Sequence, residues 1–471
     1  MELDAFTIAV AGATGAATLL IGWRRPFVVL TALVLLVPFR DFATRWMNVH
    51  SGLSVQQVTA LGRWWFAVVA ALLLLSTVRW SLIHRAARRP PSPGPTDILL
   101  GVVLVWGVMA TLISPASNSA FTSFRGYVQP LMVFLLARLV RPKRQELRLL
   151  VVLWLVVGLL MAAFALVQVA AWDEATFRAE GYVRQDGSLV VPYSTIGERR
   201  YLRPASTVSG PNELGLDMVL LLLLAGFAAV HAIPKLRAPL VGLMLVLTGA
   251  MALSVSRSAF LGLMAAALAA AALSRGRLFS SLRRMPPRAR TRATVVGLAG
   301  LAAVVAIFGA AGMLSVVSRT VTNLTRAYHF VDSAEAFQFL VQHPQGVGMG
   351  LVEPKGALTL IEAGGTYHVE GSLFQIAMEM GVWGLAAWLA FWGAALARIY
   401  RNFHALRSAE LRVLTGTAFA GWLGSLVAFL FLPLMQSISL MVWLWFLLGV
   451  GYQSLSIEAA WEAATPAAVE S

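Results

Sequence analysis

Long apolar runs separated by short polar breaks cover almost the whole chain. A run of about 18 or more apolar residues is long enough to cross a bilayer as a helix. We expect about thirteen such helices, at residues 5–22, 26–39, 62–83, 97–114, 121–139, 149–171, 212–232, 239–255, 258–273, 293–314, 371–397, 412–434 and 438–455. The second run is short, so the expected count is about twelve to fourteen. The pattern predicts an all-α, polytopic transmembrane helix bundle with a large extracytoplasmic loop between late helices.

The composition of the 471 residues excludes a water-soluble enzyme. Hydrophobic residues make up 58% of the chain and charged residues 13%, with a mean hydropathy of +0.75. Cysteine is absent, which removes disulfides, iron–sulfur ligation and a thiol nucleophile from consideration. The first apolar run has no basic start or small-residue cleavage site, so we expect it to be a retained helix.

Basic residues are concentrated in short loops. The chain has 37 Lys and Arg against 22 Asp and Glu, a formal charge of +15. Most of the basic residues lie in six loops: Arg24 and Arg25; Arg79 to Arg89; Arg138 to Arg148; Lys235 and Arg237; Arg275 to Arg292; and Arg398 to Arg412. This is the positive-inside pattern, which predicts that these loops are cytoplasmic. Nucleic-acid binding is excluded, because these linkers lack interleaved aromatic residues on a folded face.

Two long polar segments, 172–211 and 315–370, then fall together on the extracytoplasmic face. Loops of this length with mixed charge are usually functional. A folded cap with Phe337, Phe339 and Leu340 on a helix-like stretch is expected, and disordered tethers are the alternative. We divide the chain into an N-terminal bundle (1–204), a region that carries most of the candidate site residues (205–400) and C-terminal helices (401–471).

The segment SGPNELGLDM, Ser209 to Met218, places Asn212, Glu213 and Asp217 at the start of a transmembrane helix. Glu213 and Asp217 are four residues apart and share a helix face, so they are expected to face a polar cavity or basic partners. Helix capping by Asn212 and Glu213 is the alternative explanation.

The segment LSVSRSAFLG, Leu253 to Gly262, breaks the positive-inside rule with a lone arginine, Arg257. An arginine among serine hydroxyls is suited to hold a phosphate. Interfacial snorkelling of Arg257 is the competing interpretation.

The third segment, from Arg319 to Glu370, includes Arg326, His343 and the sequence HPQGVGMG. Its histidines lack the spacing of a zinc site, so no metal is expected. The glycines follow no predicted strand and precede no Walker lysine, which favours a tight turn over a nucleotide loop.

His368 and Glu370 directly precede the next helix, and either could act as a general base toward a hydroxyl. A capping role for Glu370 beside an incidental His368 is the alternative. Within that helix, Gln375 and Glu379 form a polar stripe. Glu379 is either functional or paired with an arginine of another helix.

Together these segments resemble the O-antigen ligase and O-antigen polymerase superfamily of bacterial membrane glycosyltransferases. The resemblance rests on SGPNELG, SVSRSAFLGL, Arg326 ahead of HPQGVGMG, and EGSLFQIAMEMGVWGL, and covers about residues 205 to 400. It implies transfer of a glycan from undecaprenyl diphosphate to an acceptor hydroxyl at the periplasmic face, without cofactor or metal. It also implies that Arg257 and Arg326 bind the diphosphate, with Arg319 and Arg203 as helpers.

One departure from the family pattern bears on the activity. Ligases of the family typically have His-Asn where this chain has Glu370-Gly371, so the base is expected to be Glu370 or His368. This difference favours a polymerase over a ligase that uses a lipid A core acceptor. Rival interpretations are a transporter or lipid flippase, for which Glu379 is the main argument, a peptidoglycan-type polymerising glycosyltransferase and a membrane scaffold.

Overall fold

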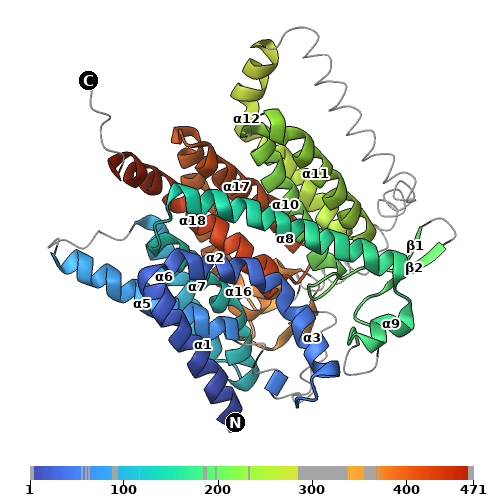
Figure 1. The fold of residues 1–471 in the computed structure, drawn as a ribbon. Coiled ribbons are helices and arrows are strands. Elements are labelled where there is room, and N and C mark those ends of the chain that lie inside the picture. Colours follow the sequence, from blue (N-terminus) through green and yellow to red (C-terminus); the bar gives the residue numbers. More distant parts are fainter. Residues whose placement is uncertain are drawn as a thin grey trace, which may run out of the picture.

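The computed structural model is a bundle of long helices with two small two-stranded sheets at one end (Figure 1). The residues that the structure describes are 5–54, 57, 58, 61, 64–86, 94–115, 117–183, 188–196, 199–231, 234–284, 338, 340–354, 367–369 and 371–464.

The first half of the chain forms helices that alternate in direction, followed by a small cap. These elements are α1 (Ala5–Arg24), α2 (Pro26–Leu36), the 3-10 helix η1 (Val37–Phe39), α3 (Arg40–His50), α5 (Trp64–Ala86), α6 (Pro95–Leu112), α7 (Ser117–Leu139), α8 (Arg144–Ala171), α9 (Glu174–Ala179), β1 (Tyr193–Ile196) and β2 (Arg199–Leu202). Strands β1 and β2 pair antiparallel, with Tyr193 opposite Leu202.

The second half adds six long helices and a short parallel strand pair. These elements are α10 (Pro211–His231), α11 (Pro234–Ser254), α12 (Arg257–Arg284), β3 (Val352–Pro354), β4 (Tyr367–Val369), α16 (Ser372–Ala405), α17 (Ala409–Phe429) and α18 (Ile438–Ala464). Each predicted apolar run except 293–314 coincides with a helix, and 293–314 lies outside the described residues.

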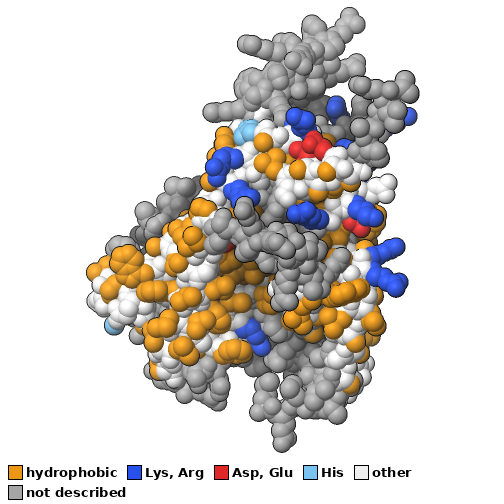
Figure 2. Space-filling view, turned by 90° about the vertical axis from the view of Figure 1, so that its left-hand side faces the viewer, with side chains coloured by type: hydrophobic (Ala, Val, Ile, Leu, Met, Phe, Trp, Pro, Cys, Tyr) orange, Lys and Arg blue, Asp and Glu red, His pale blue; other side chains and the backbone are white. Residues whose placement is uncertain are grey.

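Nine helical segments within the described ranges are long and apolar enough to cross a membrane. Apolar side chains lie on the outer surface of these segments, as shown by Leu112 and Leu268, which are 74% and 72% exposed. Figure 2 shows a broad hydrophobic surface with Lys and Arg side chains gathered toward its upper part. Because lipid offers no hydrogen-bond partners, a helix is the one open-ended element that satisfies its own backbone there. The prediction of an all-α multi-pass membrane protein is confirmed.

The core lies around α18, where aromatic rings from four helices meet. The ring centroid of Trp445 in α18 lies 4.8 Å from that of Trp422 in α17 and 6.1 Å from that of Trp388 in α16. Phe134 of α7 lies 6.0 Å from the same ring. All four side chains are buried. Aromatic edge and tilted contacts of this kind contribute packing energy beyond the area that they bury.

The irregular segments gather at one end of the bundle, which we call the loop end. It carries the connections 203–210, 255–256, 343–350 and 430–437. Ser372 at the start of α16 donates from its backbone N–H to Leu432 O, and Ser437 donates to the Glu213 carboxylate at the start of α10. The opposite end, the basic end, carries the Arg138–Asp97 ion pair and the bond from Arg398 to Tyr452.

The described part of 172–211 is folded at the loop end. Phe177, Tyr182, Val191, Leu202 and Ala205 form a small separate core against Phe42 of α3. The described part of 315–370 is folded there too, with Leu340 buried against Val352, Ala377 and Met378. Phe337 and Phe339 lie outside the described residues. A folded cap was therefore the right expectation for the described portions of both segments.

Close packing of α12 on α17 depends on two glycines, and this generates a prediction. A methyl group on Gly424 would lie 2.4 Å from Gly262 O, whereas one on Gly393 would meet nothing within 4 Å. We expect Gly424→Ala to destabilise the protein by about 1–3 kcal/mol through overpacking. The matched control Gly393→Ala should leave the thermal unfolding temperature in detergent unchanged. Equal unfolding temperatures for both variants would contradict this contact.

Candidate functional site at the loop end

A buried glutamine and an arginine from two other helices hold the turn 203–210. Ser206 has a left-handed φ of 51°, and its N–H donates to Gln168 Oε1 of α8 at 2.7 Å. Tyr182 donates to Ser206 O at 2.5 Å. Arg45 of α3 donates to Val208 O and Ser209 O at 2.9 and 2.7 Å. The backbone on both sides of Ser206 is thus fixed before any ligand binds.

Arg203 extends from this turn across the start of α10 to the end of α11. Its Nε donates to Ser254 O at 2.6 Å and its Nη2 donates to Asn212 Oδ1 at 2.8 Å. These two bonds orient a half-buried guanidinium at the junction of three segments. Asn212, for which helix capping was the alternative, accepts a hydrogen bond from Arg203.

Arg257 lies next to this guanidinium as the first residue of α12. The pKa of Arg203 is lowered to about 10, chiefly by burial and to a smaller extent by the positive charge of Arg257. A pKa of about 10 still leaves Arg203 charged at neutral pH. Arg257 is exposed and makes no hydrogen bond or ion pair with any described residue. Two neighbouring cations therefore lie beside a helix N-terminus, whose dipole also favours an anion.

The serines around Arg257 serve the backbone rather than a ligand. Ser254 donates its hydroxyl to Met251 O at 2.6 Å, and Ser256 Oγ accepts from Ala259 N at 3.3 Å, capping α12. Val255 between them has a left-handed φ of 48°. The Ser254 hydroxyl is therefore already used on the backbone, whereas Ser256 accepts a bond and keeps its own hydroxyl proton to donate.

Glu213 and Asp217 bind serines. Glu213 accepts from the N–H of Ser209 at 3.0 Å and from the hydroxyls of Ser209 and Ser437. The bond to the Ser209 N–H resembles a capping box, which supports the capping interpretation for Glu213. Asp217 is fully buried; its Oδ2 accepts from Ser439 at 3.4 Å, and its Oδ1 has no hydrogen-bond partner in the described part of the chain.

The HPQGVGMG segment is a tight turn packed on α16. Val347 N and Gly348 N donate to Met378 O and Glu379 O at 2.8 and 3.2 Å. Val382 N donates back to Pro344 O at 2.9 Å. Gly381 interrupts α16 with a φ of 73°, which frees the carbonyls that receive the turn. The expectation of a tight turn is confirmed, and the turn meets a kink inside the helix.

The Glu379 side chain also holds the turn 343–350 against α16. Its Oε1 accepts from Ser123 Oγ at 2.8 Å and from Gly350 N at 3.0 Å, and its Oε2 accepts from Tyr127 OH at 2.9 Å. The carboxylate is fully buried and both of its oxygens are satisfied. Among the described residues, its hydrogen-bond partners are hydroxyls and an amide, and none of them is an arginine. Neither Ser123 nor Tyr127 of α7 could be identified from the sequence pattern.

Several expected site residues fall outside this description. Arg319, Arg326 and Glu370 lie outside the described residues. His368 lies in β4, with its backbone opposite Glu353 of β3, and its side chain is also outside the description. Among the described residues, no group of three or more His, Cys, Asp or Glu side chains could hold a metal ion.

Comparison with known proteins finds no matching protein-family model and no matching curated protein. The function is therefore argued from the residues and their geometry.

The hydrogen bonds that Glu379 accepts predict that its removal destabilises the folded protein. Glu379→Ala leaves the Ser123 and Tyr127 hydroxyls and the Gly350 amide without their acceptor, which should cost about 3 kcal/mol. Tyr127→Phe removes one of these bonds and should cost about 1 kcal/mol. Thermal unfolding in detergent measures both. An unfolding temperature unchanged by Glu379→Ala would show that the carboxylate does not anchor the turn.

Proposed function

We propose that this chain is a membrane glycosyltransferase of the O-antigen polymerase and ligase type. It transfers a glycan from undecaprenyl diphosphate to an acceptor hydroxyl, and polymerisation of surface polysaccharide repeat units is the preferred reaction. In this proposal the protein lies in the bacterial inner membrane with the loop end facing the periplasm. The basic loops at the other end support that orientation.

The observation that carries the proposal is the Arg203–Arg257 pair. The positive charges of Arg203 and Arg257 oppose each other, and among the described residues neither guanidinium has a carboxylate as a hydrogen-bond or ion-pair partner. An anion with two or more charges relieves this repulsion, and a diphosphate matches the planar donors of both arginines. The pair lies at the loop end, where a lipid-linked diphosphate would reach it from the membrane interface.

The pair suits a diphosphate that departs during reaction. In the proposed inverting step, the base removes the acceptor's hydroxyl proton and that oxygen attacks the anomeric carbon. The bond from this carbon to the diphosphate oxygen breaks, and the electron pair stays on the diphosphate. Arg203 and Arg257 stabilise the charge that develops there. Glu370 or His368 would receive the proton, and Arg326 and Arg319 would add positive charge.

The fixed position of Arg203 also favours this chemistry over transport. A transporter is expected to place its polar groups near the bilayer midplane on broken helices. Glu379, the acid that most favoured transport, is saturated by three hydrogen bonds that anchor a turn. Arg203 and Arg257, by contrast, lie at the loop end, at the ends of helices.

Arg257 provides the cleanest test, because it contacts no described partner and its loss should not unfold the protein. Arg257→Ala should reduce glycan transfer by about 10²–10³-fold, the usual effect of removing one preorganised donor. Arg257→Lys should be more active than Arg257→Ala and less active than wild type, because it keeps the positive charge but loses the planar set of guanidinium N–H donors. The control is Arg178→Ala, which removes an exposed arginine of the cap that pairs with Glu174.

The assay is a gel of surface glycans from a strain that lacks the chromosomal copy and carries each variant. Loss of the long-chain ladder with a single repeat unit still attached would identify a polymerase. Loss of all attached glycan, with polymer accumulating on undecaprenyl diphosphate, would identify a ligase. Full activity of Arg257→Ala at normal membrane levels would overturn the diphosphate site.

The base is tested by Glu370→Gln and His368→Ala in the same strain. Removal of the true base should abolish the product, because the acceptor hydroxyl would keep its proton. The other variant should retain most of the product and serves as its control. If both variants were correctly inserted and fully active, the base would have been assigned to the wrong residues.

A further inference from the structure

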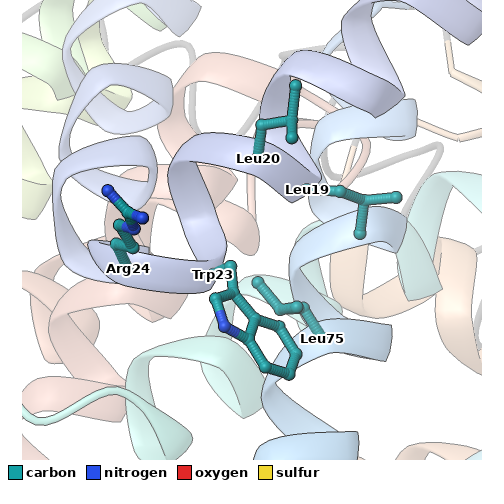
Figure 3. Close-up of a pocket in the computed structure, with 5 residues that line it drawn as sticks. All are labelled: Leu19, Leu20, Trp23, Arg24 and Leu75. Carbon is teal, nitrogen blue, oxygen red and sulfur yellow. The ribbon is translucent and has the colours of Figure 1, made fainter.

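A second feature lies far from the loop end, in a groove between α1 and α5. Leu19, Leu20, Trp23, Arg24 and Leu75 line it, and its volume is about 680 Å³ (Figure 3). Leu19, Leu20 and Trp23 are 40%, 76% and 52% exposed, so the groove opens to the lipid-facing surface. Gly22 lets α1 approach α5 closely at its floor, because any side chain there would meet Leu72 and Leu75.

The groove lies toward the basic end. From Arg25, the chain runs through α2 and η1 toward the loop end, where Phe42 N donates to Thr207 O. The apolar part of the segment between Arg25 and the loop end is Pro26–Phe39, which comprises helices of 11 and 3 residues. At 1.5 Å per residue this is about 20 Å, less than the roughly 30 Å hydrocarbon core. If only this apolar part lies in the hydrocarbon, we expect Arg24 and Arg25 to lie near the level of the lipid headgroups.

Arg24 and Arg25 have no side-chain partner within the part of the chain that the structure describes. The side chains of Arg24 and Arg25 are exposed, and neither makes a hydrogen bond or ion pair with any described residue. Arginines at this depth are costly unless an anion neutralises them. Trp23 beside them is typical of the membrane interface, where its ring lies at the level of the headgroups.

We propose that this groove binds one anionic glycerophospholipid. The acyl chain lies along Leu19, Leu20 and Leu75, and the phosphate pairs with Arg24 and Arg25. The apolar floor and the membrane-facing opening fit an acyl chain, and the two unpaired guanidinium groups fit its phosphate. A net negative headgroup is preferred, because a zwitterionic lipid would bring its own cation next to two arginines. The site is separate from the proposed diphosphate site and does not depend on it.

The test uses the full-length protein in detergent, titrated with phosphatidylglycerol or phosphatidylcholine of identical acyl chains and observed by native mass spectrometry. Wild type should retain phosphatidylglycerol more tightly than phosphatidylcholine. The double variant Arg24→Gln/Arg25→Gln should weaken phosphatidylglycerol binding by about 10- to 30-fold. The matched control Lys235→Gln/Arg237→Gln removes the same charge at another exposed basic loop and should retain wild-type affinity.

A second pair of variants tests the groove itself. Leu20→Trp fills it from an exposed position, and Leu112→Trp adds the same ring at a similarly exposed site outside it. Only Leu20→Trp should weaken phosphatidylglycerol binding. The proposal is overturned if the double arginine variant keeps wild-type affinity, if both lipids bind equally well to wild type, or if Leu20→Trp and Leu112→Trp behave alike.

Discussion

Backbone amides that leave a helix inside an apolar bundle need acceptors from the protein, because lipid supplies none. Two irregular segments of this chain meet that constraint in the same way. Gln168 accepts from Ser206 N in the turn 203–210, and Glu379 accepts from Gly350 N in the turn 343–350. Each acceptor is a fully buried polar side chain on a spanning helix. The order of the whole loop end depends on these two side chains.

This order is what the proposed chemistry requires. A leaving group is stabilised best by donors that need no rearrangement when charge develops. Arg203 is oriented by Ser254 O and Asn212 Oδ1, so its guanidinium is in place before a ligand arrives. Arg257 stands free on the N-terminus of α12 and is able to follow the substrate. One fixed cation and one adaptable cation suit a diphosphate that changes position as its bond to the sugar breaks.

The sequence was sufficient to predict the spanning helices, because a helix that crosses lipid needs a long run of apolar residues. It also singled out Glu379, because a charged group inside an apolar run needs a reason, whereas Arg203 was named only through the family resemblance. It could not identify their partners. Ser123 and Tyr127 precede Glu379 by about 250 residues, and their hydroxyls are ordinary in sequence. The contact of Arg203 with Ser254 depends on the left-handed turns at Ser206 and Val255, which no apolar periodicity encodes.

Hydrogen-bond partners within the protein distinguish the polar residues that stabilise the bundle from those that are available to a ligand. Glu379, Glu213 and Gln168 use their oxygens on protein donors, so their loss is expected first as a loss of stability. Arg257 at the loop end and Arg24 at the basic end have no such partners among the described residues. An unpaired cation at a membrane interface is neutralised from outside the protein. This argument supports both proposals, a lipid-linked diphosphate at the loop end and a bulk anionic lipid at the basic end.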